Sequence, residues 1–314
     1  MTVHIVSTGL TLCHFLGNRP GSHGLDPALA GEIRACRPTE VFGTAGAVDG
    51  QAAGALLSAC TGPGPSDLRD RLTAMIPRIA PESWPETASA ELTSLARTPD
   101  GRRLLPSSDM AVLLSTDTAE GLTAALWNAI ALTGGDLDRI VYLDTPEQRP
   151  MTARGNAVVV RVPGLDARDQ RSFSRAMQGL GTLGRHLHRG TIAPDEECRF
   201  HLSGGYKATV PFLLGLAEGI RSLPGAGPVT AYAVHETTSG DPIRLPLRRI
   251  PRSLIDPLIE VFAHRPVSWR APMEDELEGY AYDRETEDPP RWRLNPFGAG
   301  LLALYGPPAE GMSP

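Results

Sequence analysis

Short apolar runs that end in small, polar turns are the feature of this sequence that most restricts its fold. They occur at Thr2–Ser7, Met110–Leu114, Arg139–Leu143, Ala157–Val162, Cys198–Leu202, Val229–His235 and Ile243–Leu247. Between several of them, apolar residues recur at three- and four-residue steps, the spacing of an amphipathic helix. Buried strands that alternate with helices predict an α/β fold with a Rossmann-like, doubly wound, mostly parallel sheet.

The spacing of apolar residues also predicts where helices lie. The predicted helices cover residues 25–36, 50–60, 66–79, 85–97, about 121–132, 166–189 and 208–223. In the fourth of these we expect Ala90, Leu92 and Leu95 to face inward. The pattern changes after Pro251, so we expect a domain over residues 1–250 and a small C-terminal segment over 251–314.

Within that segment, two stretches allow separate predictions. The stretch Trp292–Tyr305 is compatible with a short strand followed by a helix. Residues 274–288 are strongly acidic and show no clear period, and we interpret them as a solvated loop.

Composition and charge exclude several classes of protein. With 314 residues, 41% of them hydrophobic, the chain is long enough for a large core. A net charge of −6 argues against binding to duplex nucleic acid, which needs a basic face. No apolar run is long enough for a transmembrane helix, and residues 1–8 do not resemble a signal peptide.

The cysteine pattern and the missing nucleotide motifs narrow the chemistry further. The four cysteines are scattered without metal-ligand spacing, so we expect no metal and a reducing, cytoplasmic location. Neither a GxGxxG fingerprint after the first strand nor a GxxxxGK[ST] loop is present, so we expect no cofactor.

Three polar loops follow predicted strands and are the candidate ligand site. Ligands of open parallel sheets bind at the carboxyl ends of the strands. The candidate ligand-binding residues in these loops are Ser7, Thr8 and Gly9, then Ser115, Thr116, Asp117 and Thr118, and finally Ser203, Gly204, Gly205 and Tyr206. The second and third loops open into helices, whose N-terminal N–H groups favour phosphate.

The third loop ends in Lys207, the only lysine among the 30 basic residues. An arginine-rich chain that keeps one lysine points to a site where the compact ammonium group matters, as in phosphate binding. A lysine in the first turn of a helix opposes the helix dipole, and a bound anion would reverse that penalty.

Structural interpretations of the same residues stay open at this stage. Gly204 and Gly205 are compatible with an ordinary tight strand-to-helix turn. We expect Asp117 to be the N-cap of the following helix, with Glu120 completing a capping box.

Five segments, in order, resemble one known family. They are the helix motif in Ala88–Leu95 (ASAELTSL), the strand and turn in Val112–Gly121 (VLLSTDTAEG), Val158–Leu165 followed by Phe173, the turn in His201–Ala208 (HLSGGYKA), and the closing stretch Ala231–Leu247. Together they are similar to the single-domain CARF (CRISPR-associated Rossmann fold) group found with type III CRISPR systems, which includes ring nucleases. The resemblance covers roughly residues 1–250.

This resemblance implies a ligand, an assembly and an activity. The ligand would be a cyclic oligoadenylate, with cyclic tetra-adenylate favoured over hexa-adenylate. It would bind across the two-fold axis of a homodimer, a symmetry that suits a repeating ring. Some members cleave the ring without a metal: a ribose 2′-hydroxyl attacks the adjacent phosphorus and leaves a 2′,3′-cyclic phosphate.

The resemblance also assigns roles to residues. Lys207 would bind and stabilise the phosphate, and Gly204 and Gly205 would supply backbone donors. A first-loop hydroxyl would complete the catalytic site. Thr11 matches best, with Ser7 and Thr8 as alternatives, because this loop reads Ser-Thr-Gly-Leu-Thr-Leu instead of the family's Ser-Thr-Val-Gly-Thr-Ser. His14, a candidate general base, is interpreted as an ordinary loop histidine.

Two other functions compete with the ring nuclease. The first is a non-catalytic sensor in which the C-terminal segment reports ligand binding. The second is a ligand-controlled transcription factor whose tail is a degenerate winged helix, although the acidic 274–288 stretch argues against DNA binding. Nuclease effectors are disfavoured because His264 is the only histidine, and no lysine is present, after residue 250.

Overall fold

The computed structural model describes residues 1–18, 28, 67–149, 154–166, 169–205, 207–234, 241–272 and 275–306. Apart from Ala28, the predicted helices at 25–36 and 50–60 lie outside the described residues. Tyr206, a candidate ligand-binding residue, also lies outside them.

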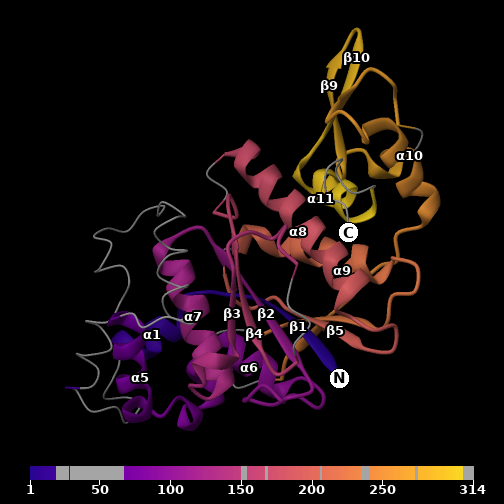
Figure 1. Cartoon of the computed structure of the whole chain (residues 1–314). Coiled ribbons are helices and arrows are strands. Elements are labelled where there is room, and N and C mark those ends of the chain that lie inside the picture. The colour runs from indigo at the N-terminus through magenta and orange to yellow at the C-terminus, as the bar shows by residue number, and fades with distance from the viewer. Residues whose placement is uncertain are drawn as a thin grey trace.

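A seven-stranded sheet forms the centre of the described chain (Figure 1). Its strands are β1 (Thr2–Ser7), β2 (Met110–Thr116), β3 (Ile140–Leu143), β4 (Ala157–Val162), β5 (Glu197–His201), β6 (Val229–Ala233) and β7 (Ile243–Leu245). The strand order is β3-β4-β2-β1-β5-β6-β7, and only β7 pairs antiparallel. The fold is therefore α/β with a Rossmann-like, doubly wound sheet, as the sequence predicts.

Helices cover both faces of this sheet. They are α1 (Thr11–Asn18), α5 (Asp67–Ile79), α6 (Ala90–Arg97), α7 (Ala119–Thr133), α8 (Gln170–Gly190) and α9 (Val210–Arg221). Side chains of α1, α5, α6 and α7 share one hydrophobic core, and those of α8 and α9 share the other. Figure 1 shows α7, α1 and α5 on one side of the strands and α8 and α9 on the opposite side.

Helix α6 begins later than predicted and is buried along most of its length. Short 3-10 turns precede it at η2 (Pro81–Ser83) and η3 (Glu86–Ala88), and the extended backbone of Ser89 separates η3 from the helix. The Ser89 hydroxyl accepts a hydrogen bond from the Leu92 amide at 3.1 Å and caps α6. Ala90, Leu92 and Leu95 are buried, which confirms their predicted inward orientation.

The described residues of the C-terminal segment form two helices and a small antiparallel sheet. They are α10 (Arg252–Phe262), β8 (Val267–Ser268), the 3-10 turn η6 (Asp275–Leu277), β9 (Tyr282–Glu287), β10 (Pro290–Leu294) and α11 (Pro296–Tyr305), with strand order β8-β10-β9. Figure 1 shows the β9–β10 hairpin extending away from the main sheet. The predicted strand and helix in Trp292–Tyr305 are confirmed.

The interpretation of the acidic stretch 274–288 as a loop is wrong for its second half, although residues 283–286 are exposed to solvent as predicted. Residues 282–287 form β9, and Glu285 contacts the guanidinium groups of Arg291 and Arg293 on β10 at 3.2 and 2.6 Å. Cross-strand pairing with these arginines compensates the acidic charge of the strand. The spacing of apolar residues gives no signal for such a charge pair.

Helix α11 packs directly on the helices that cover the sheet. A side chain at Gly181 of α8 would collide with the carbonyl oxygen of Gly300 of α11, so the two backbones approach closely. The Tyr305 hydroxyl donates to the carbonyl oxygen of Gly219 on α9 at 2.7 Å. Phe297, Leu301 and Leu304 belong to the same hydrophobic core as α8 and α9. The C-terminal segment therefore shares its core with the main fold.

Candidate functional site

Strand β1 is the switch point of the sheet, because β2, β3 and β4 lie on one side of it and β5, β6 and β7 on the other. It pairs parallel with β2 on one side and with β5 on the other, so that Val6 lies between Leu113 and His201. The carboxyl ends of the three strands therefore meet at one edge of the sheet. In open α/β sheets this edge, at such a switch point, is where ligands bind.

The turns after β1 and β5 are in direct contact. The Ser7 hydroxyl donates to the carbonyl oxygens of His201 and Gly204, at 3.2 and 2.8 Å. A side chain at Gly9 would come within 2.6 Å of the Gly205 amide nitrogen. The first and third predicted loops thus form one cluster of main-chain groups.

Two glycines are required for this contact. Gly205 has φ of 84°, a left-handed conformation that side chains disfavour. A Cβ atom on Gly204 would lie 2.6 Å from the Ser7 carbonyl oxygen and would collide with Glu91 Oε1. The Gly-Gly pair therefore serves a close approach of two loops as well as a tight turn.

The second predicted loop joins the cluster through Thr8. The Thr8 hydroxyl donates to the Leu114 carbonyl oxygen of β2 at 2.8 Å, and its amide donates to the same oxygen at 3.2 Å. Ser115 is fully buried, and its hydroxyl donates to the Thr116 carbonyl oxygen at 2.9 Å. All three loops lie at one edge, but several of their hydroxyls serve the protein's own backbone.

Ser7, Thr8 and Thr11 are the three candidates for the first-loop hydroxyl of the catalytic site, and their hydrogen bonds distinguish them. Ser7 and Thr8 are each 4% exposed and donate to main-chain carbonyls. Thr11 is half-buried and begins α1, and His14 lies exposed on that helix instead of in a loop. Of the three, Thr11 is therefore the hydroxyl best placed to reach a ligand.

Asp117 is not the N-cap of the following helix. The Thr118 hydroxyl caps α7 by accepting from the Gly121 amide at 3.0 Å, and it contacts the Thr116 hydroxyl at 3.0 Å. Asp117 instead binds Arg161 of β4, accepting from Nε at 2.7 Å and from Nη2 at 3.2 Å. A bidentate ion pair with the guanidinium of Arg161 is stronger than a capping hydrogen bond, because it compensates the charge of the half-buried Asp117 carboxylate.

Arg161 is a candidate site residue that sequence reasoning missed. Its Nη1 atom donates to Asp144 Oδ1 at 2.8 Å, and the Tyr142 hydroxyl donates to the same carboxylate oxygen at 2.9 Å. Hydrogen bonds to Asp117, and to a lesser degree to Asp144, outweigh burial and raise the pKa of Arg161. The signal in the sequence was one arginine inside a valine-rich strand.

The third loop places its cation at the surface. Lys207 is exposed and begins η5 (Lys207–Thr209), a 3-10 turn that precedes α9. The Ser203 hydroxyl accepts from the Val234 amide at 2.7 Å and ties this loop to the end of β6. The lysine therefore follows a turn that β1 and β6 hold on both sides.

Helix α6 contacts the loop cluster through Glu91, a second candidate site residue that sequence reasoning missed. This carboxylate is buried, and its Oε1 atom accepts from the Gly9 amide at 2.6 Å. Because the same oxygen lies against Gly204, Glu91 contacts the first and third loops together.

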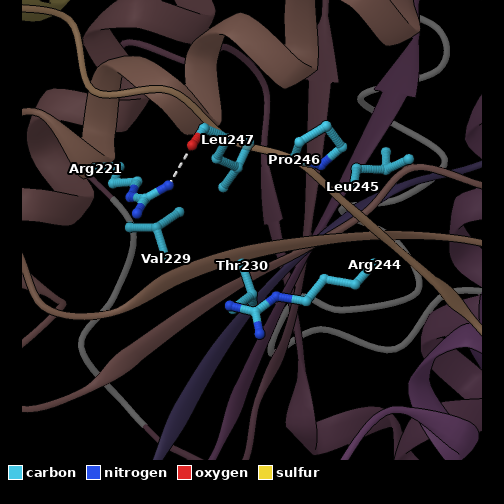
Figure 2. A pocket seen from close by; sticks show the side chains of 7 residues that line it. All are labelled: Arg221, Val229, Thr230, Arg244, Leu245, Pro246 and Leu247. Atoms are coloured by element: carbon cyan, nitrogen blue, oxygen red, sulfur yellow. Dashed lines mark hydrogen bonds between the residues drawn. The ribbon is translucent and has the colours of Figure 1, made fainter.

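A separate pocket lies where β6, β7 and the end of α9 meet (Figure 2). It has a volume of about 280 Å³, and its lining residues are Arg221, Val229, Thr230, Arg244, Leu245, Pro246 and Leu247. Arg221 donates to the Leu247 carbonyl oxygen. The Leu-Pro-Leu motif at 245–247 therefore lines this pocket, and β7 ends at Leu245, earlier than predicted.

Comparison of the chain with known protein families finds no match, and comparison with curated proteins finds none either. Across the part of the chain that the structure describes, no helix is both long and apolar enough to cross a membrane. What the loop cluster does is therefore inferred from its own residues.

Proposed function

We propose that this protein is a CARF-type protein that binds a cyclic oligoadenylate at the cluster formed by the β1, β2 and β5 loops. The observation that carries the proposal is the contact between Ser7 and Gly204. It brings a two-glycine turn, followed by the exposed Lys207, against the first loop at the switch point of the sheet.

The electrostatics of the cluster favour a phosphate. Helices α1, α7 and η5–α9 all begin at this edge, and helix N-termini present unpaired N–H groups and partial positive charge. Lys207 adds a full charge, and Arg161 compensates the Asp117 carboxylate, which would otherwise repel an anion.

Ring cleavage would use positioning and charge stabilisation by the protein. The 2′-oxygen of one adenylate bonds to the neighbouring phosphorus, the bond from phosphorus to the 5′-oxygen breaks, and the 2′-hydroxyl proton passes to that leaving oxygen. Lys207 would stabilise the extra charge on the phosphorane, and Thr11 would orient a reacting oxygen. The products are linear, with a 2′,3′-cyclic phosphate and a 5′-hydroxyl, and the proposed reaction needs no metal.

A two-fold homodimer completes the proposal. In such an assembly each subunit would contact an identical half of the ring, which suits a ligand of four or six repeated units. Cyclic tetra-adenylate is the favoured ligand, and we propose a cytoplasmic protein.

A sensor without cleavage activity is the alternative, and the packing of α11 favours it. Helix α9, which follows the Lys207 turn, contacts α11 through Tyr305 and Gly219. A ligand that moved the start of α9 would therefore shift the C-terminal segment. The transcription-factor alternative gains no such support. DNA reading by a winged helix needs a recognition helix, whereas between β8 and β9 the described residues form only the short, acidic turn η6.

One assay tests the proposal and separates nuclease from sensor. The purified protein is incubated with labelled cyclic tetra- and hexa-adenylate in EDTA, and both the bound and the cleaved fractions are measured. Linear products that disappear in Lys207→Ala, but persist in the control Arg244→Ala, support the nuclease. Binding of an intact ring supports the sensor, whereas no binding of either ring contradicts the proposal.

A further inference from the structure

Four buried or half-buried polar side chains form a continuous chain through the core beneath the loop cluster. His4 Nδ1 and His201 Nε2 are 3.0 Å apart, and the Ser94 hydroxyl lies 2.8 Å from His201 Nδ1. At the other end, His4 Nε2 lies 3.7 Å from Asp109 Oδ2, so the carboxylate charge faces this ring nitrogen. Ser94, His4 and His201 are at most 5% exposed, so these polar groups depend on one another.

The negative charge of Asp109, 3.7 Å from His4 Nε2, sets the direction of the two hydrogen bonds that join His4, His201 and Ser94. Burial raises the pKa of Asp109, but interactions with His4, Ser108 and the Thr2 amide outweigh that effect and lower it to about 2. An ionised carboxylate favours a proton on the facing nitrogen, so His4 carries its proton on Nε2. Its Nδ1 atom must then accept from His201 Nε2–H, and His201 Nδ1 must accept from Ser94.

Burial is the main reason that the two rings favour their neutral forms. Burial, the charge of His4 when protonated, and Arg199 lower the pKa of His201 well below its usual value. Burial also lowers the pKa of His4, although Asp109 and Glu197 oppose this and Arg199 reinforces it. Each ring therefore holds one proton, and the donor order runs from Ser94 through His201 to His4.

Two members of this order, Ser94 and His201, lie on elements that form the candidate site. Ser94 lies on α6, the helix whose Glu91 accepts from the Gly9 amide. His201 ends β5, and its carbonyl oxygen accepts the Ser7 hydroxyl proton. The chain thus connects α6 to the strand that leads into the Gly204–Gly205 turn, while Glu91 connects the same helix to the first loop.

We infer that Ser94 and His201 are positioning residues for the proposed ligand site, and that together with Glu91 they fix the first and third loops on α6. The inference rests on the proposed function only for what these loops bind. The end of the side-chain chain that is remote from Ser94 is accessible, because His4 and Asp109 line a pocket of about 390 Å³ at the amino ends of the strands.

Nitrogen-15 NMR of histidine-labelled protein tests the hydrogen-bond order without any ligand. At pH 7 we expect both rings to be neutral, with the proton on Nε2 and a bare Nδ1. The signals of His14, which is exposed on α1, serve as the internal reference for a solvent-facing ring. A proton on Nδ1 of either buried ring, or a doubly protonated ring, overturns the inferred order.

Amide hydrogen exchange of Ser94→Ala tests the positioning role, with Thr93→Ala as the matched control. Thr93 is also buried on α6, but its hydroxyl donates to the carbonyl oxygens of Glu86 and Ser89, away from β5. Loss of the Ser94 donor should speed exchange at residues 7–9 and 203–205 about tenfold, whereas Thr93→Ala should leave these amides unchanged.

The affinity for cyclic tetra-adenylate provides the final readout. It should fall in Ser94→Ala and stay constant in Thr93→Ala. Unchanged loop exchange in Ser94→Ala overturns the inference whatever the ligand. Faster loop exchange in a protein whose wild type binds neither ring overturns the proposed function and leaves the positioning role standing.

Discussion

The Ser7 hydroxyl lies 2.8 Å from the carbonyl oxygen of Gly204 and donates to it, 197 residues away in the sequence. This hydrogen bond joins the two loops on which the proposed site depends. It also shows that Ser7, a candidate ligand-binding residue, already has a partner in the free protein.

Replacement of Ser7 by alanine should therefore destabilise the protein. The buried carbonyl oxygen of Gly204 would lose its donor, which costs about 1–3 kcal/mol. Urea unfolding measures the loss. The exposed Ser83, whose hydroxyl also donates to a carbonyl oxygen, is the control, and Ser83→Ala should change the free energy of unfolding by less than about 0.5 kcal/mol. Equal effects of the two variants would contradict the role of Ser7.

Gly204→Ala tests the close approach of the loops. A methyl group at this position collides with Glu91 and with the Ser7 carbonyl oxygen. The variant should lose about 1–3 kcal/mol of stability, as overpacked sites do, and should lose ligand binding as well. Gly190→Ala, at a helix position where an added Cβ has no neighbour within 4 Å, should lower neither stability nor binding. Thermal unfolding and ring binding provide the readouts, and a fully stable Gly204→Ala variant would refute the packing argument.

The buried histidine pair predicts how stability depends on pH. The pKa values of His4 and His201 are lowered in the folded state, chiefly by burial. The unfolded chain therefore binds more protons below about pH 6.5, and stability is present above that pH and lost as the pH falls toward the folded-state values. Each histidine contributes a slope of at most about 1.4 kcal/mol per pH unit.

Urea unfolding at a series of pH values between 5 and 8 measures this slope. His14→Gln, at an exposed position, should leave the slope unchanged. A free energy of unfolding that stays constant from pH 8 to pH 5 would show that the buried pair does not stay neutral.

Arg161 and Asp117 predict a compensating pair of substitutions. Arg161→Ala leaves the Asp117 carboxylate without its partner beside the proposed phosphate site, so ring affinity should fall about tenfold. The double variant with Asp117→Asn removes the uncompensated charge and should recover most of that affinity. Titration with cyclic tetra-adenylate measures both changes, and equal losses in the single and double variants would rule out charge compensation as the role of Arg161.

The sequence predicts the sheet well because buried parallel strands are local signals. Strand β1 and strand β4 begin and end at the predicted residues, and Gly204–Gly205 marks the turn that the fold requires. Helix α6 shows where this reasoning stops. Because Glu91 and Ser94 are buried as well as Leu92, the polar residues of this helix do not mark an exposed face, and its pattern does not identify its partners.

Long-range pairing limited the prediction of the candidate site. The local sequence predicts Asp117 as the N-cap of the helix that follows it, whereas its actual partner, Arg161, lies 44 residues away. Glu91 and Gly9 are separated by 82 residues. Such pairs depend on the strand order, which no periodic pattern of one chain encodes.

The affinity of Lys207 variants for cyclic tetra-adenylate, measured by calorimetry, tests the central claim most directly. The wild type should bind with a Kd below about 10 µM, corresponding to about 7 kcal/mol. Lys207→Ala should bind at least about tenfold more weakly, because a charge-assisted contact is lost, and Lys207→Arg should recover only part of the affinity. A wild-type protein that fails to bind the ring in this range, or a Lys207→Ala variant that binds as tightly as the wild type, would contradict the account.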